Sequence, residues 1–195
     1  MKNLKSFFII IFLIAASIQN TLAQETVKRS SPLRFLIGAG LELGGDEVAE
    51  VYFTNGNTQS VKAGQGGSIA LGGQLAFPGL EKLLLRTTIG FKYVTTAADN
   101  VHIRLTRIPV HVTAHWMFTD KWGVGAGLAS HRNIRFKADG IGDDINFKGT
   151  TGPRFEIAYR GISLSYTAMK YQDNYNETYS ANAVGLWYTL TIPNK

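Results

Sequence analysis

Few residues of this 195-residue chain are placed where their chemistry could support catalysis. Ser130 and His131 are its only adjacent serine and histidine, and a hydrolase or acyltransferase would need such a pair close to an acid. Neighbouring residues of a strand point to opposite faces, so these two side chains would diverge if they lie in a strand. A catalytic triad would therefore have to assemble from other parts of the chain.

Residues that could bind a metal are equally sparse. His111 and His115, two of the four histidines, share a face in a strand but lie about 13 Å apart along it, too far for one ion without a third group. Asp139, Asp143 and Asp144 stand among glycines but lack the alternating ligands and closing glutamate of an EF-hand loop. The chain has no cysteine, which excludes a disulfide and a thiolate metal site. We expect a solvated loop, no metal site and no cofactor.

The elements that position these residues are predicted to be strands, because apolar and polar residues alternate with a period of two. In the first such segment Leu33, Phe35 and Ile37 share one face, whereas Arg34 and Glu42 lie on the other. No segment after the amino terminus shows sustained helical periodicity. The alternation recurs in eight segments, which are residues 33–43, 69–77, 83–93, 101–118, 122–128, 154–159, 162–168 and 183–192.

Charged residues follow the same alternation. The apolar faces of the eight segments carry no charge, and the opposite faces carry a set that we predict to form a charge network in a lumen: Arg34, Glu42, Arg86, Lys92, Arg107, Arg154 and Glu156. We expect Arg107 and Arg154 to surround Glu156. We also expect Arg104 and Lys121 to point inward. A soluble barrel would bury its apolar face, so this division indicates lipid on the outside.

These features predict an all-β fold, an eight-stranded antiparallel up-and-down transmembrane β-barrel with periplasmic short turns and longer extracellular loops. The even number of strands brings both termini to the side of the short turns. A lumen of eight strands is just wide enough to be filled by side chains, which argues against an open pore. Aromatic residues near the short turns predict an interfacial girdle: Phe35, Phe77, Trp116, Phe118, Trp122, Tyr159 and Tyr188.

A projecting hairpin is predicted within the first long connection. Asn55 and Gly56 are a strong signal for a type I′ turn. A hairpin about this turn would pair residues 44 and 45 with residues 66 and 67. We expect its tip to project beyond the lipid.

A β-bulge is predicted in the fourth segment. Its apolar positions change from odd numbers, as at Ile103 and Leu105, to even numbers. One extra residue at Thr106 and Arg107 would account for this change. Pro109, which lacks an amide hydrogen, follows directly and fits an irregular ladder.

The amino terminus predicts export from the cytoplasm. Two lysines precede an apolar run that is too short to cross a bilayer of roughly 30 Å, and small residues follow at 21 and 23. We expect a cleavable signal peptide at 1–23, a short periplasmic segment at 24–32 and an outer-membrane barrel at 33–192. Cleavage lowers Lys+Arg from 20 to 18 against 14 Asp+Glu, so the net charge falls from +6 to +4. This mild charge and export both argue against nucleic acid as a partner.

Several short motifs carry a family resemblance. The segments 38–46 (GAGLELGGD), 63–66 (AGQG), 90–93 (GFKY) and 107–109 (RIP) resemble those of small outer-membrane β-barrel proteins of Gram-negative bacteria, a functionally uncharacterised group. The resemblance covers most of the chain from the first strand to the last. It implies the barrel fold and brings no catalytic or binding residues with it.

The sequence therefore predicts a non-enzymatic outer-membrane protein with a structural or surface-interaction role through its projecting hairpin and outer loops. Expected partners are outer-membrane lipid and lipopolysaccharide, together with the export and barrel-assembly machinery. Two alternatives stay open, a lipid A-modifying enzyme (deacylase or acyltransferase) and a narrow channel.

Overall fold

The computed structural model describes residues 32–52, 58–96, 102–140 and 142–193. These residues form thirteen strands, and no helix among them is long and apolar enough to cross a membrane. The predicted signal peptide at 1–23 lies outside the described residues, as does the predicted turn at Asn55 and Gly56.

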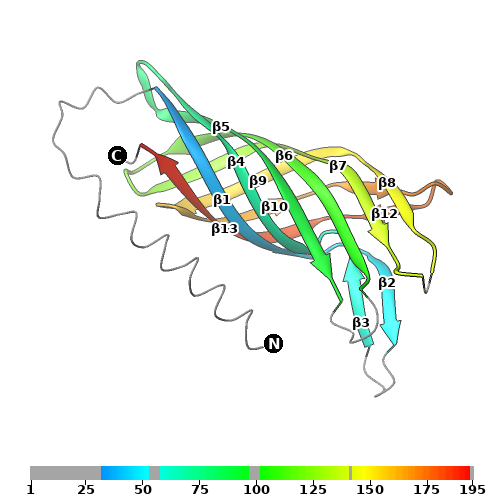
Figure 1. Ribbon diagram of the computed structural model, residues 1–195. Coiled ribbons are helices and arrows are strands. Elements are labelled where there is room, and N and C mark those ends of the chain that lie inside the picture. The colour runs from blue at the N-terminus through cyan, green and yellow to red at the C-terminus, as the bar shows by residue number, and fades with distance from the viewer. Residues whose placement is uncertain (1–31, 53–57, 97–101, 141, 194–195) are drawn as a thin grey trace, which may run out of the picture. The chain divides into compact units, whose positions relative to one another are not determined.

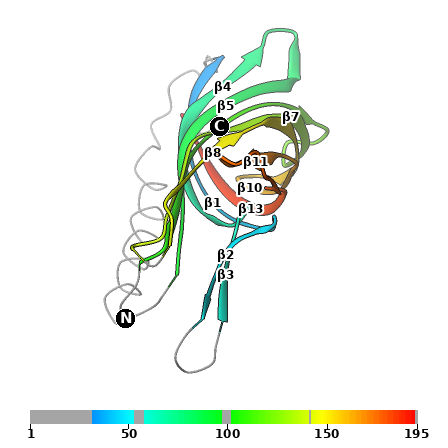
Figure 2. The same cartoon turned by 90° about the vertical axis from the view of Figure 1, so that its right-hand side faces the viewer.

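Eight antiparallel strands close into a barrel (Figures 1 and 2). In order around the ring they are β1 (Leu33–Leu43), β4 (Gly66–Phe77), β5 (Leu80–Thr95), β6 (Arg104–Met117), β7 (Trp122–Lys137), β9 (Thr151–Tyr159), β10 (Ile162–Thr167) and β13 (Ala183–Ile192). Pairing of β13 with β1 completes the ring, so each of these strands has a partner on both sides. The predicted eight-stranded antiparallel barrel is confirmed.

Five short strands extend the barrel at one end: β2 (Glu47–Tyr52), β3 (Thr58–Lys62), β8 (Ile145–Gly149), β11 (Lys170–Gln172) and β12 (Thr178–Ser180). β2 and β3 form a hairpin that projects from this end, opposite to the end where β1 begins and β13 finishes (Figure 1). β8 continues the pairing of β9 along β7, and β11 joins β8 to β12. We call these five strands, with the adjoining ends of β5, β6 and β7, the extension.

Large apolar side chains cover the outside of the barrel. Phe35 and Leu41 on β1, Leu71 on β4 and Leu164 on β10 are all more than half exposed. Their alternate neighbours point inward, as the period of two requires. Most of the aromatic residues near the short turns are exposed on the same surface, where the rings of Trp122 and Tyr159 lie 4.7 Å apart between centroids.

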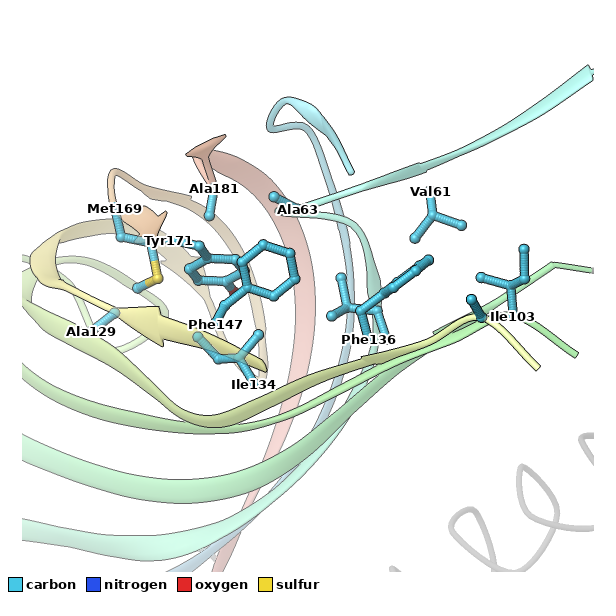
Figure 3. Packing of buried hydrophobic residues seen from close by; sticks show 12 residues of the cluster. Val61, Ala63, Ile103, Ala129, Ile134, Phe136, Phe147, Met169, Tyr171 and Ala181 are labelled. Carbon is cyan, nitrogen blue, oxygen red and sulfur yellow. The ribbon is translucent and has the colours of Figure 1, made fainter. Parts of the chain in front are cut away.

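The interior of the extension is apolar, in contrast to that of the barrel. Phe136, Phe147 and Tyr171 are buried there with smaller apolar residues, and Figure 3 shows their side chains gathered between the strands. On the outside of the same strands Arg135 and Lys137 are exposed. We call this group the apolar cluster: Val61, Ala63, Ile103, Leu105, Ala129, Ile134, Phe136, Ala138, Phe147, Met169, Tyr171 and Ala181. Inside and outside thus exchange polarity along the barrel axis, as expected where a wall leaves lipid and enters water.

This exchange corrects the predicted bulge in β6. The register between β6 and β7 shifts between Thr106 and Ile108, as predicted, but the extra residue belongs to β7, where Asn133 and Ile134 lie opposite Arg107. Asn133 has a φ of 50°, the left-handed conformation that asparagine tolerates better than most residues. β6 itself keeps one phase. Its odd-numbered apolar residues face inward because they belong to the apolar cluster, not because the strand slips.

The hairpin is also one residue away from the predicted register. Tyr52 pairs with Thr58, whereas a two-residue turn at Asn55 and Gly56 would pair residue 52 with residue 59. Gly66 lies opposite Glu42 instead of residue 45. The register differs because residues 44–46 and 63–65 form a separate corner between the barrel and the hairpin, and β2 is irregular between Glu47 and Ala49.

Candidate functional site

The centre of the lumen contains an ion-pair network built around Glu42. Lys92 Nζ donates to Glu42 Oε2 at 2.5 Å and to the carbonyl oxygen of Gly64 at 2.6 Å. Arg154 Nη1 lies 3.2 Å from Glu42 Oε1, and the indole Nε1 of Trp187 donates to the same oxygen at 3.4 Å. All these side chains are less than a tenth exposed. One carboxylate therefore binds groups from β5, β9 and β13 across the lumen.

Arg154 links this centre to a second carboxylate. Its Nε donates to Glu156 Oε1 at 2.6 Å, and its Nη1 donates to Thr167 Oγ1 at 3.0 Å. His115 Nε2 lies 3.3 Å from Glu156 Oε2. The guanidinium of Arg154 also stacks over the ring of Trp187, 5.3 Å from its centroid. Arg154 thus has partners on several sides, which a buried guanidinium requires.

Arg107 was predicted to contact Glu156 but does not. It lies closer to the extension, where its Nη1 donates to the carbonyl oxygen of Ala63 at 2.8 Å and its Nη2 donates to the carbonyl oxygen of Gln65. Its charge is thus bound by backbone oxygens at the corner that leads from the hairpin into β4. The alternation within strands could not predict these two contacts, because residues 63–65 lie outside any strand.

The other predicted lumen cations lie nearer the short turns. Arg86 Nε donates to Gln74 Oε1 at 2.9 Å, and Arg34 is buried opposite Gln74 in the β1 and β4 register. Arg104 and Lys121 are exposed, contrary to the expectation that they point inward. Arg104 lies in the extension, where the outward face is the polar one. Lys121 lies in a short turn, where no lumen remains.

The lumen is filled at two levels. The network around Glu42 and Glu156 occupies the middle, and the apolar cluster occupies the end from which the hairpin projects. A cavity remains toward the short turns, lined among others by Arg86, His111 and Trp187. The arrangement therefore suits a closed barrel with a polar recess at one end better than a continuous channel.

The candidate catalytic pair is divided between the two faces of β7. His131 points inward and hydrogen-bonds through Nδ1 with the hydroxyl of Tyr171, and Ser130 lies on the outward side. The hydrogen bond between His131 and Tyr171 connects the ion-pair network to the apolar cluster and was not predicted. The alternation predicts only that His131 points inward, because its partner is 40 residues away in the sequence.

The acidic loop residues bind the backbone. Asp139 Oδ2 accepts from the amide of His102 at 2.9 Å, and Asp144 Oδ1 accepts from the amide of Ala138 at 3.0 Å. Across the described segments of the chain, no group of three or more His, Asp or Glu side chains is arranged to hold a metal ion. Asp139 and Asp144 thus act as caps for backbone amides.

The closed ring of eight antiparallel strands, its apolar outer surface and its charged lumen define a small β-barrel protein of the outer-membrane type. No protein-family model matches the chain, and no curated protein matches it. Two solved structures of similar fold are both of Ail, the attachment invasion locus protein of Yersinia pestis, and one of them is in complex with the heparin analogue sucrose octasulfate. They are 9% and 8% identical in sequence, each with a TM-score of 0.40, and each match covers 81% of this chain and 97% of Ail.

Proposed function

We propose that this protein is a non-enzymatic barrel of the Gram-negative outer membrane that presents its extension outside the cell for surface interactions or a structural role. The observation that carries the proposal is the exchange of polarity along the barrel. Leu128 on β7 is exposed on the apolar wall, whereas Phe136 on the same strand is buried and Lys137 is exposed. A wall with this pattern passes from lipid into water, and its apolar interior makes the extension a folded platform.

The proposal assigns the short turns to the periplasm, in keeping with the side on which both ends of the barrel lie. It also includes cleavage of the signal peptide before Gln24. The intact mass of the purified protein tests that step, and a mass that includes residues 1–23 would contradict it.

Cysteine labelling in intact cells tests the orientation, because the chain has no cysteine of its own. Asp143→Cys in the loop between β7 and β8 and Glu81→Cys at the short-turn end of β5 are both at exposed positions. A membrane-impermeant maleimide should label Asp143→Cys in intact cells and Glu81→Cys only after the outer membrane is opened. The reverse pattern, or recovery of the protein in a detergent-free soluble fraction, would overturn the proposal.

The non-enzymatic part has its own measurement. Overproduction should leave the acylation pattern of lipid A unchanged when it is compared by mass spectrometry with that of cells carrying an empty vector. A change in acylation that is lost in both Ser130→Ala and His131→Ala would replace this proposal with an enzymatic one.

A further inference from the structure

A group of cations covers the outer face of the extension on one side. These residues, which we call the basic wall, are exposed and lie on the neighbouring strands β6, β7, β8 and β11: Arg104, Arg132, Arg135, Lys137, Lys148 and Lys170. Each of the six has at least one buried neighbour in the sequence, which points inward, so the six side chains share the outer surface. The wall is therefore continuous across four strands.

The strand register brings like charges together within the wall. Arg104 lies directly opposite Lys137, and Arg135 is two residues from Lys137 on the same face. Like charges directly opposite each other destabilise a sheet. In the described part of the chain the ion pairs all lie in the lumen, and none involves a residue of the basic wall. Among the described residues, none of the three acids of the loop between β7 and β8, Asp139, Asp143 and Asp144, forms an ion pair with the wall, and Asp139 and Asp144 accept hydrogen bonds from backbone amides. This concentration of charge is best relieved by an anion from outside the chain.

The position of the wall identifies that anion. Along the outer face of β7, the apolar Leu128 is followed by Ser130 and then by Arg132. Arg132 lies two residues beyond Ser130, about 7 Å along the strand, which is similar to the thickness of the headgroup layer on one side of a bilayer. Arg132 therefore lies at the height of lipid headgroups, and Lys137 lies about 13 Å farther along the wall, because the bulge leaves them opposite Ile108 and Arg104, four residues apart on β6. An anion that matches the wall must carry charges at more than one height above acyl chains.

We propose that the basic wall binds the phosphate groups of lipopolysaccharide in the outer leaflet, while the apolar face of β6 and β7 contacts the acyl chains of the same molecule. Arginine suits this role because its planar guanidinium binds phosphate oxygens in pairs. The inference rests on the proposed outer-membrane location and names the partner of its extension. Bound phosphate would also offset the repulsion between Arg104 and Lys137, which lie opposite each other.

The test compares two variants that remove the same charge. Arg135→Gln with Lys137→Gln changes the basic wall, and Lys82→Gln with Lys121→Gln changes exposed cations at the short turns. Binding of purified rough lipopolysaccharide to each protein in neutral detergent micelles is measured by titration. We expect the wall variant to bind about tenfold more weakly than the unaltered protein and the control variant to bind within about twofold of it. Equal loss in both variants, or no loss in the wall variant, would overturn the proposal.

Two further arms identify the source of the phosphate. Lipopolysaccharide from which the phosphates have been removed enzymatically should bind the unaltered protein at least as weakly as intact lipopolysaccharide binds the wall variant. The deacylated, still phosphorylated saccharide should bind more weakly than the intact lipid; equal binding would show that the wall recognises a soluble polyanion. Failure of these arms with correct cysteine labelling would reject the lipid partner and leave the proposed function intact.

Discussion

Lys92 of β5 and Glu42 of β1 are 50 residues apart in the sequence and form an ion pair across the lumen, with Nζ and Oε2 2.5 Å apart. β4 lies between their strands, so the pair spans the curve of the barrel wall instead of joining neighbours in the sheet. Arg154 of β9 meets the same carboxylate from the other side. Glu42 therefore connects three strands that do not pair with one another.

Loss of the carboxylate of Glu42 should destabilise the barrel strongly. Glu42→Gln leaves Lys92 and Arg154 buried without their shared counter-ion, and removing one partner of a buried pair typically costs about 3–5 kcal/mol. The loss is measured as a lower urea concentration at which the folded, fast-migrating form disappears on an unheated gel. Glu47→Gln, at an exposed position of the hairpin, is the control and should leave that concentration unchanged. A stability of Glu42→Gln equal to that of the control would show that the network contributes little.

Two leucines should separate the lipid-facing wall from the apolar cluster. Leu105 is fully buried in the cluster, whereas Leu128 is 57% exposed on the outer wall. Leu105→Ala should reduce the free energy of unfolding by about 2–5 kcal/mol, because it leaves a cavity. Leu128→Ala should cost clearly less under the same conditions in detergent. Equal costs would contradict the assignment of Leu105 to an interior core.

The bulge in β7 should depend on the conformation of Asn133. Its φ of 50° penalises a β-branched side chain, so Asn133→Val should lose about 1–2 kcal/mol of stability. Asn133→Gly should be close to neutral, since glycine adopts this conformation without a steric penalty. Thr151→Val, at an exposed strand position with ordinary backbone geometry, serves as the control for the added valine. The assignment of the bulge fails if valine is tolerated at both positions.

The purified barrel should not conduct ions in a planar bilayer. The network around Glu42 fills the middle of the lumen. Phe147 and Tyr171, with the rest of the apolar cluster, fill the end from which the hairpin projects. Single-channel recordings should therefore show no stable current steps, in contrast to a porin reconstituted in the same membranes. Reproducible steps that change on replacing Arg154 would support the narrow-channel alternative.

Local alternation was sufficient to predict the barrel. A strand directs successive side chains to opposite faces, so the alternation assigns Leu33 and Phe35 to the outer face and Arg34 to the lumen. The same rule placed Glu42 and Arg154 on the lumen side before any contact was known. It could not show that these two meet, because their contact depends on how far each strand is staggered around the ring.

Alternation failed where the surroundings change. Ile103 and Leu105 follow the same period as Arg107, yet the sequence pattern suggested the opposite face for them, because it assumed that apolar residues always face lipid. Beyond the lipid the outside is water, and the same side chains are driven inward. The register of the hairpin and the partners of Arg107 were hidden for a related reason, since both depend on corner residues that belong to no strand.

By itself the sequence determined the number of barrel strands, the charge-free outer face of the lipid-facing part and most of the residues available to the lumen, because these follow from a period that each strand carries alone. Only the tertiary structure decided at which height the polarity exchanges, which charges pair across the lumen and which cations gather into the basic wall. Those features depend on the stagger between strands and on the height at which each strand leaves the lipid, and neither quantity is encoded in any one strand.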